Sequence, residues 1–319
     1  MVECRLEGGD VSPDEIRERA LQRWSWRGEI QQQVVNTDID GLLTGALLPH
    51  VLGWPIVGFN DTETIWVDET ARSPLDLRET AWVDLSMCMM GARCIDNHIV
   101  SNTAREALQV YAFRQSVNPN LVVGRHRLER YEGKYPFGTF QWAAWLLDMG
   151  TLESTADDPV RAGLAWMPDG GFRSIRGPFR RNCIEWSRDF LAGGVLSPVA
   201  STSPDDALGH VQQAERFLRQ QSGVTTGWGD NHQWSMRSRG LGLTQPDHVS
   251  AQRLLDAITG HYGWRPMVLP TSYRVISRQW NCSKTPPPGW PASANRGEVI
   301  SLAAWFKNEW AWTAGPMPM

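Results

Sequence analysis

Short apolar runs in this sequence end in acidic residues, and these acids are the side chains whose type and spacing could do chemistry. We interpret the runs as strands of one sheet. In a largely parallel sheet, ligands bind beyond the carboxyl ends of the strands. Carboxylates that converge there would form an oxygen-rich pocket suited to Mg²⁺ or Mn²⁺. Two such ions about 3.5–4 Å apart would activate a water for phosphoryl hydrolysis. The acids are Asp38 with Asp40, Asp84, Asp96 in the block Asp96-Asn97-His98, and Asp169.

Each of these pieces also has an ordinary structural explanation when it is taken singly. An Asp-x-Asp-Gly stretch such as 38–41 is common in turns, and Asp84 could cap a helix. Asp96 and Asn97 could form an Asx turn, with His98 as a core residue. The order of the pieces along the chain favours a common site, in which His98 would be a nitrogen ligand or a phosphate contact.

The alternation of short apolar runs with helical stretches predicts the elements that would position the acids. It is typical of an α/β domain with a largely parallel sheet flanked by helices. A stretch rich in Gly, Pro and Ser at 192–203 predicts a boundary between a metal-binding domain at 1–195 and a smaller α+β accessory domain at 196–319. The expected helices cover 13–26, 42–52, 102–114, 140–147, 204–221 and 247–261, and the expected strands lie at 34–35, 55–59, 64–67, 81–85, 93–95, within 267–277 and at 298–306.

Composition bounds the function further. The chain has 319 residues, 41% of them hydrophobic and 21% charged, which is enough for a buried core. A net charge of −4 argues against a surface that binds nucleic acid all round, but a local basic groove remains compatible with it. No apolar stretch approaches about 20 residues, and the first residues lack a signal-peptide pattern. Five cysteines without a Cys-x-x-Cys pair agree with a reducing compartment. We therefore expect a cytoplasmic protein without a membrane partner.

The ordered acids resemble the motifs of the DHH phosphoesterase superfamily. Residues 34–44 are similar to its first motif, an apolar strand followed by an acid pair, Gly and a hydroxyl residue, and 82–84 to its second, a single Asp at a strand end. Asp96-Asn97-His98 resembles the DHH signature with its middle histidine replaced, and 163–172 resembles the fourth motif. The resemblance covers roughly residues 30–175, about half the chain.

The resemblance implies a two-metal phosphoesterase that uses Mn²⁺ or Mg²⁺. Asp84 would bridge the two ions, His98 would lie near the substrate phosphate, and Asp96 would order the signature loop. The catalytic residues implied are Asp40, Asp84 and His98. The metal ligands implied are Asp38, Asp40, Asp84 and Asp169, together with Asn36 and Asn97 at positions that the family fills with stronger ligands.

Two alternatives stay open beside the enzyme. Because Asn36 and Asn97 are neutral, the chain could be a degenerate member that binds a nucleotide or nucleic acid without cutting it. The Asp-x-Asp-Gly stretch also begins haloacid-dehalogenase-type phosphatases, in which Asp38 would be the nucleophile and Asp40 the acid/base. In that case Lys134 would be the required cation, and Asp230 would belong to the last acidic motif.

An arginine-rich segment directly follows Asp169 and predicts how a substrate would be bound. Arginine side chains can hold phosphates in a bidentate manner, and Phe172 or Phe179 could stack on a base. A smaller basic cluster lies at 125–127. The expected substrate is a nucleotide, a short single-stranded nucleic acid or a cyclic dinucleotide. The arginines are Arg173, Arg176, Arg180 and Arg181.

Overall fold

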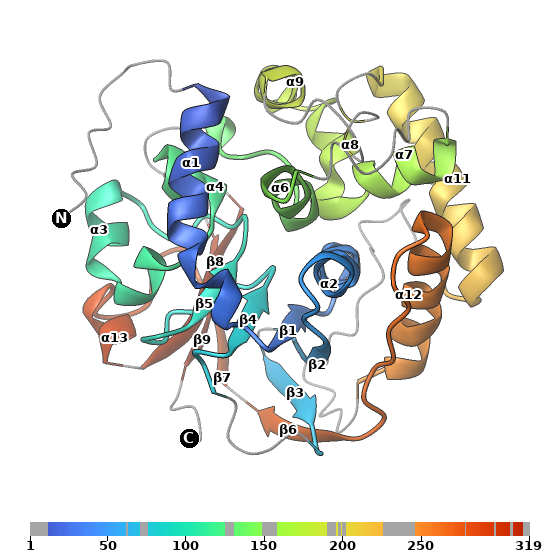
Figure 1. Cartoon of the computed structure of the whole chain (residues 1–319). Coiled ribbons are helices and arrows are strands. Elements are labelled where there is room, and N and C mark those ends of the chain that lie inside the picture. Colours follow the sequence, from blue (N-terminus) through green and yellow to red (C-terminus); the bar gives the residue numbers. More distant parts are fainter. Residues whose placement is uncertain are drawn as a thin grey trace.

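A six-stranded sheet in the order β5-β4-β1-β2-β3-β6 forms the centre of the protein (Figure 1). The computed structural model describes residues 12–61, 63–70, 76–124, 131–148, 158–189, 196, 199, 202–225, 246–277, 279–296, 298–306 and 309–314. Strands β5, β4, β1 and β2 run parallel, and β3 and β6 are antiparallel to their neighbours. The predicted α/β class with a largely parallel sheet is therefore confirmed. The strands are β1 (Gln32–Asn36), β2 (Ile56–Asn60), β3 (Thr64–Asp68), β4 (Thr80–Val83), β5 (Arg93–Ile95) and β6 (Tyr273–Ser277).

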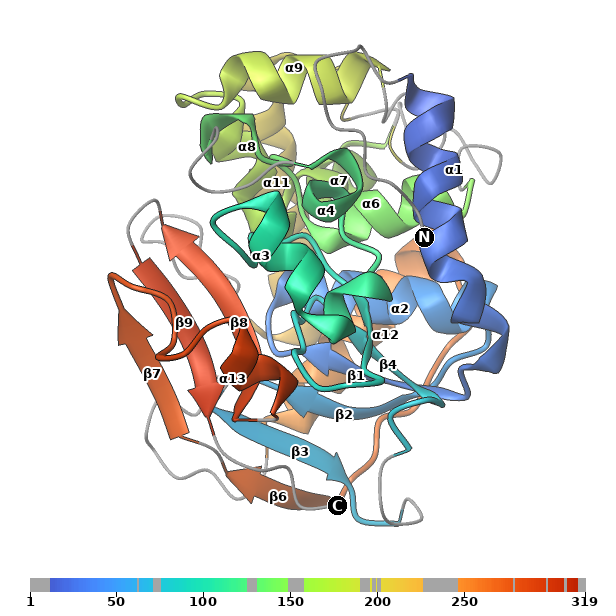
Figure 2. The ribbon, with the colours of Figure 1, turned by 90° about the vertical axis from the view of Figure 1, so that its left-hand side faces the viewer.

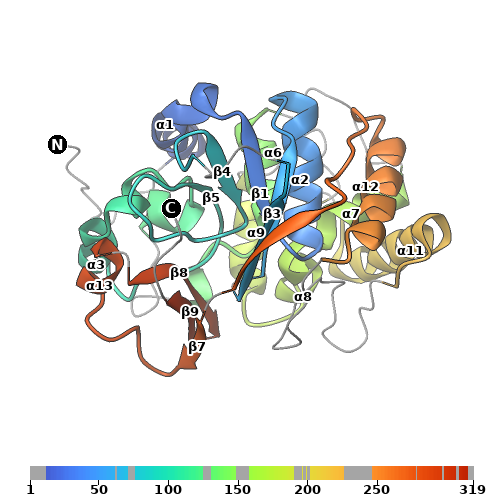
Figure 3. The ribbon, with the colours of Figure 1, turned by 90° about the horizontal axis from the view of Figure 1, so that it is seen from below.

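Helices flank this sheet on both sides (Figure 3). Helix α2 is buried along nearly its whole length, because it packs against strand β1 of the sheet and against the helices α6 and α12. In Figure 3 the sheet runs between α2 and α12 on one side and α3 and α13 on the other. The longer helices are α1 (Pro13–Arg23), α2 (Ile39–Val51), α6 (Thr139–Leu146), α7 (Pro159–Trp166), α9 (Arg180–Asp189), α11 (Pro204–Ser222) and α12 (His248–Tyr262). The shorter ones are η1 (Trp24–Glu29), α3 (Ala104–Gln109), η2 (Tyr111–Arg114), α4 (Pro119–Val123), η3 (Tyr131–Gly133), η5 (Pro168–Gly170), α8 (Gly171–Ser174) and α13 (Ala292–Asn295).

A small antiparallel sheet in the order β7-β9-β8 forms the C-terminal part (Figure 2). Its strands are β7 (Gln279–Ser283), β8 (Val299–Phe306) and β9 (Glu309–Ala314). Strand β8 is attached to the loop that follows β4. The Leu302 N–H donates to the Ser86 carbonyl at 3.0 Å, and the Cys88 N–H donates to the Ile300 carbonyl at 2.6 Å. The small sheet is thus fixed next to the residues that immediately follow Asp84.

Segments beyond the predicted domain boundary also take part in the main sheet and its helical layer. Strand β6 pairs with β3, α11 packs against α7, and α12 packs against α2. Most of residues 190–201 lies outside the described residues, and the boundary near 195 stays a prediction. No described helix has both the length and the apolar character needed to cross a membrane.

The structure corrects two predicted elements. The run 161–167, interpreted as a strand that ends in an acid, is helix α7. Asp158 caps this helix by accepting hydrogen bonds from the N–H groups of Val160 and Arg161, and Pro159 occupies its first turn. The single helix expected at 102–114 is instead α3 followed by η2, because Val110 between them has an extended backbone with ψ of 114°.

Candidate functional site

Three of the predicted acids lie together at the carboxyl edge of the parallel strands. Asp38 follows β1 and caps α2, where its Oδ1 accepts the Gly41 N–H at 3.0 Å. Asp84 directly follows β4, and Asp96 directly follows β5. Because β1, β4 and β5 are parallel neighbours, their ends place these carboxylates side by side. Asp84 has a φ of +59°, a left-handed backbone that L-residues adopt at a cost.

Asn36 joins two of these carboxylates. Its Nδ2 donates to Asp38 Oδ2 at 3.1 Å and to Asp84 Oδ2 at 2.8 Å, while its Oδ1 accepts the Thr37 N–H at 2.8 Å. The predicted ligand therefore presents amide protons, not its oxygen, to the acids. Gly41 is required here for space, because a Cβ at that position would lie 2.2 Å from the Asn36 carbonyl oxygen.

Asp40 faces a different way from Asp38. Its side chain is fully buried, its Oδ2 accepts the Thr139 N–H at 2.7 Å, and its Oδ1 accepts the Phe140 N–H at 2.9 Å. These N–H groups begin α6 and have no partner within the helix. Gly138 allows the approach, since a Cβ there would lie 2.4 Å from Asp40 Oδ2. Asp40 thus fixes α6 against α2, and it is absent from the described residues that line the site cavity.

Thr139 also belongs to the site, although its sequence context did not single it out. It is brought there by the hydrogen bond between its N–H group and Asp40. Its hydroxyl donates to Asp84 Oδ1 at 2.8 Å and lies 3.4 Å from Asn97 Oδ1. Asp84 is therefore held from two sides, by Thr139 and by Asn36. The sequence signal available was the Gly-Thr pair that opens a predicted helix.

Asp96 and His98 form a buried dyad. Asp96 Oδ1 lies 2.5 Å from His98 Nδ1 and accepts the His98 N–H at 3.0 Å. Its Oδ2 accepts from Ser86 Oγ at 2.5 Å and from Asn118 Nδ2 at 2.8 Å. Burial alone would raise the pKa of Asp96, but the charge and hydrogen bonds of His98 hold it below its usual value. Burial likewise opposes the charge on His98, yet Asp96 raises the pKa of His98 to about 9.

Asn97 brings Asp169 to the site from a distant part of the chain. Its Nδ2 donates to the Phe137 carbonyl at 2.7 Å and to Asp169 Oδ2. Asp169 lies in the turn η5 after α7, with a φ of +49°. The expectation that it ends a strand is wrong, because the preceding run is helical, but its carboxylate nonetheless reaches Asn97.

These side chains surround a cavity of about 320 Å³. Strands β8 and β9 of the small sheet supply a largely apolar wall. Asp61 and Ser86, which the sequence analysis did not name, also line the cavity. Asp61 follows the apolar run of β2 as Asp84 follows that of β4, so the same pattern could have found it. The described lining residues are Asn36, Asp38, Asp61, Asp84, Leu85, Ser86, His98, Lys134, Pro136, Phe137, Asp169, Ser174, Ser301, Leu302, Ala303 and Ala311.

The electrostatics of the site is that of clustered negative charge. Burial raises the pKa of Asp84 well above its ordinary value, and Asp40, Asp38 and Asp169 raise it further. Burial also raises the pKa of Asp40, with Asp169 and Asp38 adding to the effect. Ligand-type atoms of Asp84, Asp96 and His98 all lie within 4.8 Å of one another, so this group could hold a metal ion. Both carboxylates of this group already accept hydrogen bonds at each oxygen, Asp96 from His98, Ser86 and Asn118, and Asp84 from Thr139 and Asn36.

None of the four arginines predicted to bind the substrate is among the described residues that line this cavity. All four are exposed. Arg176 pairs with Asp205 at 3.0 Å, and Arg181 pairs with Glu185 at 2.9 Å. The residues at 125–127, the side chain of Phe172 and Asp230 lie outside the part of the chain that the structure describes.

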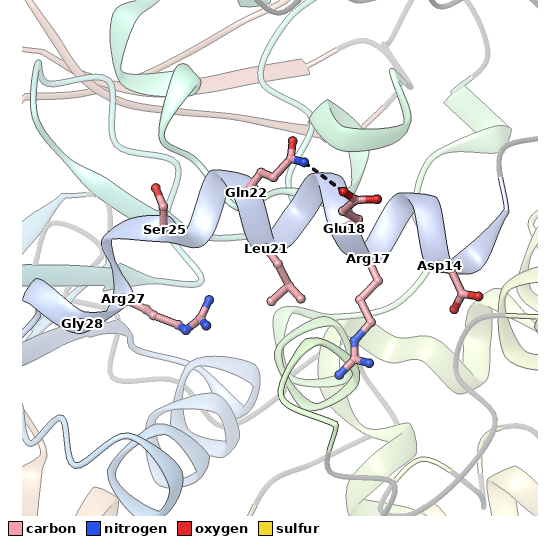
Figure 4. A pocket seen from close by; sticks show the side chains of 8 residues that line it. All are labelled: Asp14, Arg17, Glu18, Leu21, Gln22, Ser25, Arg27 and Gly28. Carbon is pink, nitrogen blue, oxygen red and sulfur yellow. Dashed lines mark hydrogen bonds between the residues drawn. The ribbon is translucent and has the colours of Figure 1, made fainter.

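A second hollow, of about 790 Å³, runs along α1 and the turn after it (Figure 4). Its side chains alternate in charge, and Gln22 Nε2 donates to Glu18 Oε1 at 3.3 Å, as neighbours on one exposed helix do. This arrangement is typical of a solvated helix face and gathers no ligand set.

Comparisons of the chain with protein-family models, with curated proteins and with solved structures give no match.

Proposed function

We propose that this chain is a divalent-metal-dependent phosphohydrolase that acts on a nucleotide or a phosphodiester, such as a short single-stranded nucleic acid or a cyclic dinucleotide. The observation that carries the proposal is the convergence of Asp38, Asp84 and Asp169 with His98 on one cavity. Perturbed buried carboxylates that gather in a cavity are typical of functional sites. The resemblance to the DHH phosphoesterases, which rests on the order of the same acids, supports the same reaction class.

The donor set fits a hard divalent cation. Asp84, Asp38 and Asp169 would supply carboxylate oxygens, which are ligands suited to Mn²⁺ or Mg²⁺. The pKa of Asp84 is raised first by burial and then by the charges of Asp40, Asp38 and Asp169, so a cation bound beside it would favour its ionised form. A cation held there would polarise a phosphate ester and acidify an attacking water.

The protein's own residues would orient the reacting groups. Asn36 and Thr139 each donate to a different oxygen of Asp84 and so fix its carboxylate plane. Asp96 engages His98 at Nδ1 and leaves Nε2 as the ring nitrogen available to a ligand. With a pKa of about 9, His98 carries a proton at neutral pH. It could therefore bind a phosphate oxygen or donate the proton to the leaving group.

A binding protein without turnover is the second candidate, and a specific observation favours it. Asn36 and Asn97 stand where the resemblance implies stronger ligands, and both use their amide protons to hold carboxylates. The aspartyl-phosphate alternative is weaker, because its acid/base, Asp40, has both oxygens bound to N–H groups of α6.

The deciding experiment is hydrolysis of bis(p-nitrophenyl) phosphate and of a short oligonucleotide by the purified protein with Mn²⁺. We expect turnover that Asp84→Ala abolishes. Asp148→Ala is the matched control, because Asp148 is an exposed acid with a similar left-handed backbone, at a φ of +56°, and is absent from the described lining of the cavity. Full activity in the Asp84 variant would refute the mechanism, and nucleotide affinity without turnover would favour the binding protein.

A further inference from the structure

Lys134 is the residue of the cavity that the proposed mechanism does not use. It follows η3 and lines the same cavity as Asp84 and Asp169. Apart from the His98 imidazole, it is the only cationic side chain among the described lining residues. Its ammonium group thus belongs to a cavity whose other charged side chains are mostly carboxylates.

The position of Lys134 is fixed on several sides. Its Nζ lies 5.6 Å from the ring centroid of Tyr131 and 6.0 Å from that of Phe179, distances at which a cation is attracted to an aromatic face. Its N–H donates to the Tyr131 carbonyl at 3.1 Å, and its own carbonyl accepts a hydrogen bond from Asn182 of α9. The two rings are themselves in edge-to-face contact at 5.9 Å. The side chain is therefore held in place before any ligand arrives.

The ammonium group nevertheless has no carboxylate partner within ion-pair distance in the described part of the chain. By contrast, the buried Arg93 pairs with Glu29 at 2.6 Å. Burial lowers the pKa of Lys134, while Asp169 and Cys183 favour the charged form without contacting it. A partly desolvated cation of this kind is stabilised when a ligand brings an anionic group to it.

We propose that Lys134 binds the non-bridging oxygens of the substrate phosphate and thereby selects anionic phosphate esters. This rests on the proposed function, because it places the phosphate between Lys134 and the acid cluster. Ser174 lines the same cavity and offers a hydroxyl donor near this position. The volume of about 320 Å³ is at the lower end of the range for small-molecule sites. The substrate class is therefore a small phosphorylated compound, or one terminal unit of a strand.

Two measurements separate a ligand-binding role from a packing role. The first is calorimetric titration of inorganic phosphate into the metal-loaded protein, with Mg²⁺ in excess. The second is the kinetics of bis(p-nitrophenyl) phosphate hydrolysis with Mn²⁺. The variants are Lys134→Met, which keeps the aliphatic stem between the rings, Lys134→Arg, which keeps the charge, and the control Lys284→Met on an exposed loop after β7.

A charge-assisted hydrogen bond to phosphate predicts that Lys134→Met weakens phosphate binding and raises KM about ten- to a hundredfold. Lys134→Arg should stay within a few-fold of the wild type, and Lys284→Met should be unchanged. Circular dichroism and the melting temperature would show that the variants are folded. Unchanged phosphate binding and KM in folded Lys134→Met would overturn the inference, as would wild-type protein that does not bind phosphate at all.

The same data distinguish this inference from the proposed function. Phosphate binding that depends on Lys134, with no turnover of any substrate, would keep the anion site and remove the hydrolase. Turnover that depends on Asp84 but is unchanged in Lys134→Met would keep the hydrolase and remove the anion site.

Discussion

Replacing Asp84 with asparagine should make the metal-free protein more stable at pH 8 while it removes metal-dependent activity. Asp84 is fully buried, and its pKa is raised by burial and by three neighbouring carboxylates, so its ionised form is disfavoured in the folded state. Asparagine is a conservative replacement because it tolerates the φ of +59°. Its amide oxygen can accept from Asn36, and its NH₂ group can donate to the Thr139 hydroxyl, which is also an acceptor.

The sign follows from proton binding. A carboxyl whose pKa is raised on folding holds a proton in the native state at pH values where the unfolded chain has released it. Its contribution to stability is therefore complete below the ordinary pKa near 4 and is lost as the pH rises through the raised value. The loss is about 1.4 kcal/mol per pH unit for each proton so held. Asp40 and His98 change stability in the same direction, because their pKa values are also raised, His98 to about 9.

Between pH 6 and pH 8, one retained proton corresponds to about 2.7 kcal/mol, or about 4 °C in Tm for a chain of 319 residues. The assay is thermal and urea denaturation in EDTA at both pH values, for the wild type, Asp84→Asn and Asp148→Asn as an exposed control. The wild type should lose more stability than Asp84→Asn between the two pH values, by up to that amount. Mn²⁺ should then stabilise the wild type at pH 8 more than the variant, by mass action. If the difference in unfolding free energy between Asp84→Asn and the wild type is the same at pH 6 and pH 8, the pKa of Asp84 is not raised in the folded state.

Three further outcomes follow from the space around particular small residues. Gly138→Ala should lower Tm and activity together, because its Cβ would lie 2.4 Å from Asp40 Oδ2 and displace α6; thermal melts and the phosphodiester assay check this. Gly260→Ala inside α12 is the matched control, since its Cβ would meet nothing within 4 Å, and it should stabilise the protein by about 0.5–1 kcal/mol. Ala303→Leu should raise KM with little change in Tm, because this residue of β8 lines the cavity; an unchanged KM would show that the small sheet does not face the substrate.

The sheet and the acids at its edge could be predicted because both depend on local pattern. A buried parallel strand is an apolar run, and the residue after it lies at the carboxyl edge. Asp38, Asp84 and Asp96 were found on this basis, and all three follow strands of the sheet. The pattern does not report where a side chain points. Asp40, two residues after Asp38, turns away to the N-terminus of α6, because a helix begins between them.

The remaining residues reach the site through tertiary contacts, which a local pattern does not report. Thr139 is positioned by the hydrogen bonds that N–H groups of α6 donate to Asp40, and Asp169 by a hydrogen bond from Asn97. The apolar run before Asp169 was assigned to the wrong element, since a short buried helix and a buried strand share the same composition. The sequence offered Lys134 only as the cation of the haloacid-dehalogenase-type alternative, because it lies in an irregular segment. Its place beside the Tyr131 ring and in the cavity wall indicates a different role.

The hydrolase and the binding protein share one requirement, which is a bound divalent cation. A nucleotide is an anion, and a cavity whose carboxylates already raise one another's pKa repels it. Asn36 does not relieve this repulsion, because its amide is neutral. Lys134 and His98 together carry fewer charges than the acids that line the cavity, so a binding protein would also need a bound cation to accept a phosphate. Nucleotide binding that depends on a divalent cation therefore supports both candidates, and only turnover separates them. Tight nucleotide binding in EDTA would contradict both, because the phosphate would then occupy the cavity without the charge that the carboxylates require.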